Sequence, residues 1–415
     1  MAEILDDLDC LPAVGSARAA AWADSLRDQL ELCILPYWSQ QMLDPRGGIY
    51  GGRDNDGRLR DELPRSAVLG TRVLWTFATA ARLMPHPTWH ASAEHTWKWL
   101  VDSLWDEKYG GVFWSVDAKG APLDTRKHSY AQGFAIYASA AYYRLTGSPV
   151  ALVLAQECFA ELDAAYDAQF GGYVEGCSRD WKVLEDARLS DKEPLAPKSM
   201  NTLLHLMEGY TELYLVWRNP ELGARLRELV ELFINRIWQS GSGSFGLFFS
   251  RDWKLMSDSI SHGHDIETGW LLCRAAEVLH DPFLQMQTRD LSVLVADAVL
   301  RRGVAADGSI LYEGDRQRVH NAERHWWCQA EAMVGFWDAY EQQGVESHGQ
   351  AAWNSWRYID RYFVNPAGDD WFKVLDANGI PKPGQVMAGP WECPYHHARA
   401  CFEMITRLNR DRWLA

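Results

Sequence analysis

The chain lacks an excess of basic residues. Of its 415 residues, 41 are Lys or Arg and 56 are Asp or Glu, so the formal net charge is −15 at pH 7. Nucleic acids and anionic membranes bind proteins through clustered Lys and Arg side chains. The composition therefore argues against nucleic acid and membrane as partners, and it leaves small neutral ligands open.

The sequence also lacks paired cysteines, long apolar runs and linkers. Its eight cysteines form no CxxC pair, so neither a disulfide framework nor a zinc ribbon is predicted. It has no run of about 18 apolar residues, and the N-terminal MAEILDDLDC is acidic. We therefore expect a soluble, cytoplasmic protein. Because no Ser/Pro-rich or charged linker interrupts the chain, we expect a single domain over residues 1–415.

What the sequence does contain is an internal repeat. A glycine or another small residue, an aromatic strand and a polar turn follow one another in six places. These are RGGIYGGRDNDG, YGGVFWSVDAKG, FGGYVEGCSRDWK, GSFGLFFSRDWKLMSD, DGSILYEGDRQR and DWFKVLDANGIPKPG. The copies lie roughly 63 residues apart, and stretches with helical periodicity, such as 89–105 and 130–145, separate them. Each unit is therefore predicted to be two helices and a hairpin.

Six such units predict an all-α fold, an (α/α)6 barrel of six helix pairs with short β-hairpins at one end. One helix of each pair would face inward. An open superhelix is the alternative architecture. The total of six, and terminal units that are no more polar than the middle ones, favour closure.

Polar and aromatic residues recur where each inner helix is expected to begin. They are Arg72; His128 and Tyr130; Asn201, His205 and Glu208; His264 and Glu267; Trp327, Gln329 and Glu331; and Trp391, His396, Arg399 and Glu403. In a barrel these segments converge on one mouth. A lone histidine on a helix is more often structural than catalytic, but three at comparable positions, His205, His264 and His396, favour a shared catalytic role.

Aromatic residues are abundant, with 21 Trp, 16 Tyr and 14 Phe. A large helical barrel fills its core with such side chains, and that is the simpler explanation for any single Trp. Tyr130, Trp327 and Trp391 differ because they lie at the starts of inner helices, where an aromatic face can stack on a sugar ring.

Three kinds of chemistry suit these residues. Three His and a Glu could bind zinc or iron, but the sequence lacks HExxH, and a His-x-x-Glu pair also suits a carboxylate that orients an imidazole. An inverting glycoside hydrolase would need two carboxylates across the sugar, for which Glu208, Glu267 and Glu331 are candidates, yet hydrolysis does not need the histidines. Proton abstraction beside a carbonyl fits best. A neutral His can remove the C2 proton of an open-chain aldose, a second can return a proton, and an Arg can stabilise the enediolate. This reaction needs no metal and no cofactor.

The segments KSMNTLLHLMEGYTELY, SHGHDIETGWLL, WWCQAEAMVG and WECPYHHARACFEM resemble the N-acylglucosamine 2-epimerase superfamily, and most closely its cellobiose 2-epimerase branch. The resemblance covers essentially the whole chain. It implies a cofactor-independent isomerase that inverts C2 of the reducing-end glucose of β-1,4-linked disaccharides, converting cellobiose to glucosylmannose and lactose to epilactose. Mannose 2-epimerase and mannose isomerase, which convert mannose to glucose or fructose, are the alternatives within the superfamily.

The resemblance also implies roles for individual residues. His264 and His396 would be the acid/base pair, His205 would assist ring opening, Glu267 would orient His264, and Arg72 would stabilise the enediolate oxygen. The sugar-binding positions implied are Asn201, Tyr130, Trp327 and Trp391. His262 stands where many relatives are expected to have Tyr, and Cys328 stands where other small or apolar residues are common. A sugar is the expected partner, with the protein a monomer or a weak homodimer.

Overall fold

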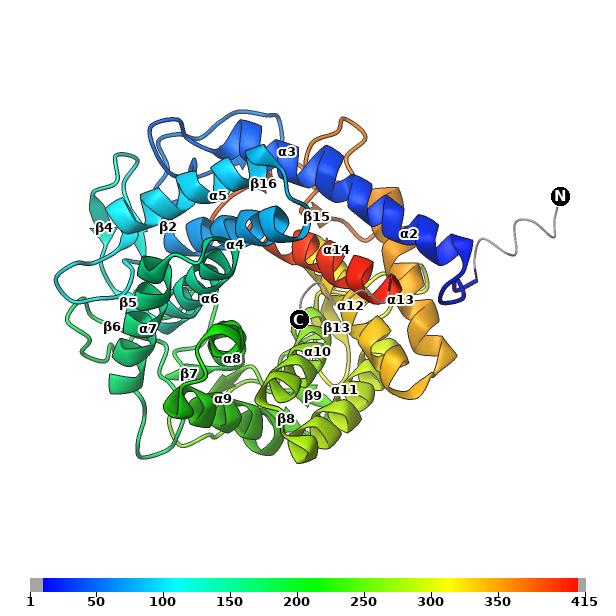
Figure 1. The fold of residues 1–415 in the computed structure, drawn as a ribbon. Helices are drawn as coiled ribbons and strands as arrows, with labels where there is room; N and C mark the ends of the chain where they lie inside the picture. Colours follow the sequence, from blue (N-terminus) through cyan, green and yellow to red (C-terminus); the bar gives the residue numbers. More distant parts are fainter. Residues whose placement is uncertain (1–9, 410–415) are drawn as a thin grey trace.

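The computed structural model describes residues 10–409, in which a ring of inner helices surrounds a central axis (Figure 1). The inner helices are α4 (Ala67–Leu83), α6 (Ser129–Thr146), α8 (Met200–Val216), α10 (His262–Leu279), α12 (Trp326–Gln343) and α14 (Tyr395–Leu408). Each contacts the next along the chain, and α14 contacts α4, so the ring is closed. The alternative of an open superhelix is therefore wrong.

A second ring of helices packs outside the first (Figure 1). Its members are α2 (Ala17–Asp28), α5 (Pro87–Trp99), α7 (Pro149–Ala164), α9 (Pro220–Leu232), α11 (Pro282–Arg302) and α13 (Glu346–Tyr358). Four of them run on into shorter segments: η1 (Gln29–Ile34), α3 (Leu35–Tyr37) and η2 (Trp38–Met42) after α2, η3 (Leu100–Leu104) after α5, η4 (Phe233–Ile237) after α9 and η5 (Ile359–Phe363) after α13. The predicted (α/α)6 barrel is confirmed.

Local sequence explains where these helices begin. Outer helices α5, α7, α9 and α11 start with proline, whose fixed φ suits the first helical position and whose missing N–H costs nothing there. Inner helices α4 and α8 start after Ser66 and Ser199, whose hydroxyls accept a backbone N–H of the first turn.

Inner helices are mostly buried, yet among the described residues no helix has the length and apolarity needed to cross a membrane.

Short antiparallel strand pairs join the start of each inner helix to the segment that follows its outer helix. The pairs are β2 (Arg65–Ser66) with β3 (Ser115–Val116), β5 (Lys127–His128) with β6 (Gly176–Cys177), β7 (Lys198–Ser199) with β10 (Phe248–Phe249), β11 (Ile260–Ser261) with β12 (Glu313–Gly314) and β14 (Arg324–His325) with β15 (Val374–Leu375). The remaining strands are β4 (Pro122–Asp124) on β3, β13 (Val319–Asn321) on β12, and β8 (Trp238–Gln239) with β9 (Ser244–Phe245). These pairs fix the first turn of each inner helix at the hairpin end.

The sixth helix pair comes from the two ends of the chain. Outer helix α2 packs against inner helix α14. Strand β1 (Arg53–Asp54) pairs with β16 (Val386–Ala388), just as the other strand pairs join a helix pair. The described chain thus opens on an outer helix and closes on an inner one, so ring closure is a long-range event.

Buried carboxylates join the hairpins of neighbouring units. Asp106, after the second outer helix, lies 3.0 Å from Lys127 Nζ and accepts two hydrogen bonds from Arg179. Asp167 repeats this arrangement with Lys198 and Arg251. Removing one partner of a buried pair leaves the other charge buried without a partner, which lowers the free energy of unfolding by about 3–5 kcal/mol. These pairs therefore hold successive hairpins in register beneath the starts of the inner helices.

The fourth residue of an inner helix bonds to the hairpin layer in three units. Gln132 accepts from the N–H of Val112 and donates to its carbonyl, both at 2.8 Å, and Gln329 does the same with Ile310. In α10 the position is Asp265, which accepts from the N–H of Phe245 at 2.8 Å while its Oδ2 has no partner. Burial raises the pKa of Asp265 to about 8. In α10, a protonated Asp265 therefore occupies the position of the glutamine and makes one of its two backbone hydrogen bonds.

We predict that Asp265→Asn removes part of the pH dependence of stability. A carboxyl whose pKa is raised on folding contributes stability below its unfolded pKa and loses it as pH rises through the folded value, by up to about 1.4 kcal/mol per pH unit. Between about pH 4 and 8 the free energy of unfolding should therefore fall less steeply in Asp265→Asn than in the wild type. Urea denaturation across that range measures the slope. Asp258→Asn, at an exposed position, is the control and should follow the wild type, whereas equal slopes in all three proteins would mean that Asp265 is ionised in the fold.

Candidate active site

Three histidines lie at the hairpin end of the barrel axis. His205 is the sixth residue of α8, His264 the third of α10 and His396 the second of α14. Aromatic rings link them: the His264 ring centroid lies 4.6 Å from that of Trp327, which lies 5.5 Å from His396. The His205 ring lies 4.9 Å from Tyr130. The structure thus brings the three predicted histidines into one region.

His396 is held by a carboxylate from the neighbouring inner helix. Its Nδ1 lies 2.8 Å from Glu331 Oε1 and 3.7 Å from Glu267 Oε1. An Nδ1–H that donates to Glu331 leaves Nε2 without a proton and makes the imidazole more basic. The unprotonated Nε2 of His396 is therefore available as a base.

His264 is held by a hydroxyl rather than by a carboxylate. Ser261, immediately before α10, places its Oγ 2.8 Å from His264 Nδ1. Glu267, one turn further along α10, instead accepts a hydrogen bond of 2.5 Å from Arg399 Nη2. Glu267 was expected to orient His264, but in this structure it bonds Arg399, and Ser261 is the partner of His264.

Arg399 of α14 bonds carboxyl groups of three other inner helices. Its Nη2 donates to Glu267 and, at 2.7 Å, to Glu331, and its Nη1 bonds Glu208. Glu208 also lies 3.0 Å from His205 Nδ1. One buried cation thereby fixes the groups that orient His205 and His396.

The carboxyl groups bonded to Arg399 differ in pKa. Burial alone would raise the pKa of Glu208, but Arg399 and His205 lower it to about 2. Burial and the neighbouring Glu331 raise the pKa of Glu267 well above its usual range, and Arg399 only partly opposes them. Glu208 is therefore ionised at neutral pH, whereas burial and the neighbouring Glu331 favour the neutral form of Glu267.

All three histidines are neutral at physiological pH. Burial lowers the pKa of His205 to about 4, against the opposing effect of Glu208. Burial, with His205 and Arg72 nearby, lowers the pKa of His264 to about 3. Burial and the cations Arg72 and Arg399 lower the pKa of His396 well below its usual value. Neutral imidazoles can accept a proton, which general-base catalysis requires.

Arg72 of α4 is a buried cation with aromatic walls. It is 2 % exposed, donates to the Tyr130 hydroxyl at 2.6 Å, and lies 4.4 Å from the Phe134 ring centroid. Among the described residues it forms no salt bridge, and its Nε has no partner. A buried guanidinium without a carboxylate partner suits a ligand that carries or develops negative charge.

The predicted sugar-binding residues surround this region. Trp391 is partly exposed, and its ring centroid lies 5.7 Å from that of Tyr130. Trp327 lies between His264 and His396, as described above. Asn201, the second residue of α8, has a buried Oδ1 with no partner among the described residues. These four residues present aromatic faces and an amide beside the histidines.

His262 and Cys328, the two residues expected to differ from many relatives, are buried in the first turns of α10 and α12. A Cβ on Gly303 would come within 2.6 Å of the His262 ring, so His262 packs against the end of outer helix α11. A Cβ on Gly263 would come within 2.5 Å of Cys328 Sγ and 2.7 Å of Trp327. Glycine at 263 thus lets the start of α10, with His264, approach α12 closely.

One group of side chains in the described residues could offer ligands to a metal ion. Atoms of Glu267, Glu331 and His396 lie within 4.8 Å of one another. Arg399 Nη2, however, bonds the same Oε1 atoms of Glu267 and Glu331, and His396 Nδ1 faces Glu331. A metal ion would have to displace a cation that is bonded to both carboxyls. The donor set therefore does not fit a metal.

The sequence profile of N-acylglucosamine 2-epimerase (GlcNAc 2-epimerase) matches residues 48–400. The chain belongs to this family. Among its relatives, cellobiose 2-epimerase of Bacteroides fragilis is 36% identical over 92% of this chain and 97% of its own. D-mannose isomerase of Marinomonas mediterranea is 21% identical over 90% of this chain and 95% of its own.

A solved member of the family has the same fold. The structure of cellobiose 2-epimerase from Bacillus thermoamylovorans superposes with a TM-score of 0.89 at 34% identity, over 94% of this chain and 100% of that one. The family profile, over residues 48–400, includes the segments that carry His205, His264 and His396.

We predict that Glu331→Gln changes the tautomer of His396. In the wild type at pH 7, the contact with Glu331 Oε1 should hold nearly all of His396 as the Nδ1–H form. The neutral amide accepts a hydrogen bond more weakly, so the Nε2–H form should become populated. Long-range 15N–1H NMR correlation of the imidazole measures both forms. Glu346→Gln, at an exposed position, is the control, and a wild-type His396 in the Nε2–H form would contradict this geometry.

Proposed function

We propose that this chain is a cellobiose 2-epimerase, which inverts C2 of the reducing-end glucose of a β-1,4-linked disaccharide. The identity of 36% to the Bacteroides fragilis cellobiose 2-epimerase, against 21% to a D-mannose isomerase, supports this substrate class. Within that class, cellobiose would give glucosylmannose and lactose would give epilactose. The family relationship supports a sugar isomerase in either case.

The observation that carries the proposal is the set of hydrogen bonds made by the three neutral histidines. Each Nδ1 is bonded to a fixed partner, which is Glu208 for His205, Ser261 for His264 and Glu331 for His396. Within residues 10–409, the Nε2 atom of each has no protein partner. Three imidazoles oriented in this way can exchange protons with one bound sugar.

We assign His396 and His264 as the pair that removes and returns the C2 proton. The bond to Glu331 leaves Nε2 of His396 free to accept the C2 proton. His264 would donate the second proton as its imidazolium, after its Nε2 has taken up a proton from solvent, while Ser261 holds its Nδ1. His205, paired with ionised Glu208, would assist opening of the pyranose ring. The reaction is a proton transfer with no net oxidation or reduction, so these side chains suffice without a metal or nucleotide.

Arg72 is the group that stabilises the intermediate. Removal of the C2 proton places negative charge on the oxygens of an enediolate, and a buried guanidinium stabilises that charge more than water does. The Tyr130 hydroxyl accepts a hydrogen bond of 2.6 Å from Arg72. Its own proton can therefore be donated to an oxygen of the enediolate. Trp391, Trp327 and Asn201 would bind the sugar beside these groups, and Glu267 acts through Arg399 rather than on the substrate.

The test is proton NMR of EDTA-treated enzyme in D2O with cellobiose, lactose and mannose in parallel. The expected result is a mannose-configured reducing end that carries deuterium at C2 in both disaccharides, since the C2 proton passes through imidazoles that exchange with solvent. Conversion of mannose alone would move the chain to the mannose branch, with fructose or glucose as the product separating isomerase from epimerase. Release of a new reducing end would instead indicate hydrolysis.

Variants assign the result to the proposed residues. His264→Ala and His396→Ala should each reduce turnover by about 10²- to 10⁴-fold, the usual contribution of a general acid or base, while sugar binding stays detectable by calorimetry. His90→Ala removes an exposed histidine and should leave the rate unchanged. Full activity in either active-site variant would remove that histidine from its role.

A further inference from the structure

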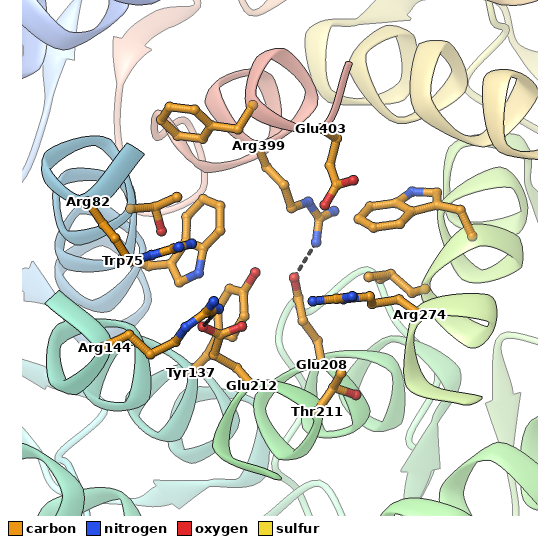
Figure 2. Close-up of a pocket in the computed structure, with 14 residues that line it drawn as sticks. Trp75, Arg82, Tyr137, Arg144, Glu208, Thr211, Glu212, Arg274, Arg399 and Glu403 are labelled. Carbon is orange, nitrogen blue, oxygen red and sulfur yellow. Dashed lines mark hydrogen bonds and ion pairs between the residues drawn. The ribbon is translucent and has the colours of Figure 1, made fainter. Parts of the chain in front are cut away.

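A pocket lies on the barrel axis at the end opposite the hairpins (Figure 2). Each of five inner helices carries residues of the candidate active site near its start and residues of this pocket further along. In α8, for example, His205 is followed by Glu208, Thr211 and Glu212, and in α10 His264 is followed by Trp270, Leu271 and Arg274. Because an α-helix rises 1.5 Å per residue, Glu212 and Arg274 lie about 10 and about 15 Å along their helices from His205 and His264.

The Glu208–Arg399 pair separates this pocket from the histidines. Both residues line the pocket, and their ion pair is drawn across its centre in Figure 2. On the other side, Glu208 bonds His205, and Arg399 bonds the Glu331 carboxylate that holds His396. A ligand in the far pocket would therefore touch the same two side chains that fix the active-site histidines.

Three further arginines converge on the pocket from three helices. Arg82 comes from α4, Arg144 from α6 and Arg274 from α10, and all three guanidinium groups point into the space in Figure 2. Two carboxylates also line it. Glu212 pairs with Arg144 at 2.8 Å, and Glu403 lies 3.4 Å from Arg407. With Arg399 and Glu208 included, four arginines and three glutamates line the pocket, so the arginines outnumber the acids by one.

The arginines repel one another. Burial, and then the charge of Arg144, lower the pKa of Arg82 to about 10. Glu212 opposes them in part, and Arg274 adds a smaller lowering effect. Arg82 and Arg144 lie in the last turns of their helices, where a cation also complements the helix dipole. Arg274 lies five residues before the end of α10, so the dipole does not account for it. A bound anion would relieve this repulsion.

We propose that the far pocket binds a small oxyanion of the phosphate class, either inorganic phosphate or the phosphate group of a sugar phosphate. Guanidinium groups bind such oxygens through two parallel hydrogen bonds each. The free volume of about 50 Å³ exceeds the 10–15 Å³ that one water needs and suits a small ion rather than a whole sugar. Trp75, Tyr137 and Trp270 form aromatic walls around it. This proposal concerns binding alone and does not depend on which sugar the active site converts.

Isothermal titration of the full chain with inorganic phosphate, at constant ionic strength set with sodium chloride, tests the site. We expect one saturable site per chain, with Kd raised at least tenfold in Arg82→Gln and in Arg274→Gln. Arg301→Gln, which removes an exposed last-turn arginine of α11, is the control and should keep the wild-type Kd. Arg274→Lys retains the charge but loses the paired donors, and it decides the matter if the Gln variants do not fold, with weaker binding again expected.

Two results would overturn the proposal. One is the absence of saturable phosphate binding by the wild type. The other is a wild-type Kd in folded variants at Arg82 and Arg274, because the ion would then bind elsewhere, for example at Arg72. A parallel titration with glucose 6-phosphate separates the two sources of the anion: tighter binding than inorganic phosphate assigns the site to sugar phosphates, and equal or weaker binding assigns it to the free ion.

Discussion

The candidate active site depends on one buried guanidinium. Arg399 joins α14 to α8, α10 and α12 through carboxyl groups at the barrel axis. Two of those carboxylates, Glu208 and Glu331, hold His205 and His396. Burial keeps the histidines neutral and favours the neutral form of Glu267, while Arg399 and His205 lower the pKa of Glu208.

The position of Arg399 is itself a product of ring closure. Helix α14 is the last inner helix, and it reaches its place by packing on α2 and α4 from the beginning of the chain and by the β1–β16 pair. The acids come from helices in the middle of the sequence. The network therefore forms only when the two ends of the chain meet, which makes closure of the barrel a condition for assembling the histidines.

The repeat in the sequence predicted the barrel and the end at which its polar residues gather, because strands of fixed spacing position every inner helix in the same way. Individual contacts between helices were harder to predict from the sequence. His205–Glu208 and His264–Glu267 have the same i, i+3 spacing, yet only the first pair forms a direct contact. The difference comes from Arg399, more than 130 residues away in sequence, which donates a hydrogen bond to Glu267. Ser261, the actual partner of His264, precedes the helix and carried no signal in a pattern based on helix faces.

The prediction of a single domain over residues 1–415 includes ends outside the described residues and stays a prediction.

We propose that His264 and His396 exchange protons with opposite faces of C2. A crystal structure with the open-chain alditol of cellobiose is the decisive test, since this compound mimics the opened sugar but cannot react. We expect Nε2 of each histidine to lie about 3–3.5 Å from C2, on opposite sides of the carbon chain, with Arg72 near the oxygens on C1 and C2. A complex in which only one histidine approaches C2, or in which a carboxylate is the nearest base, would show that these two histidines are not the acid/base pair.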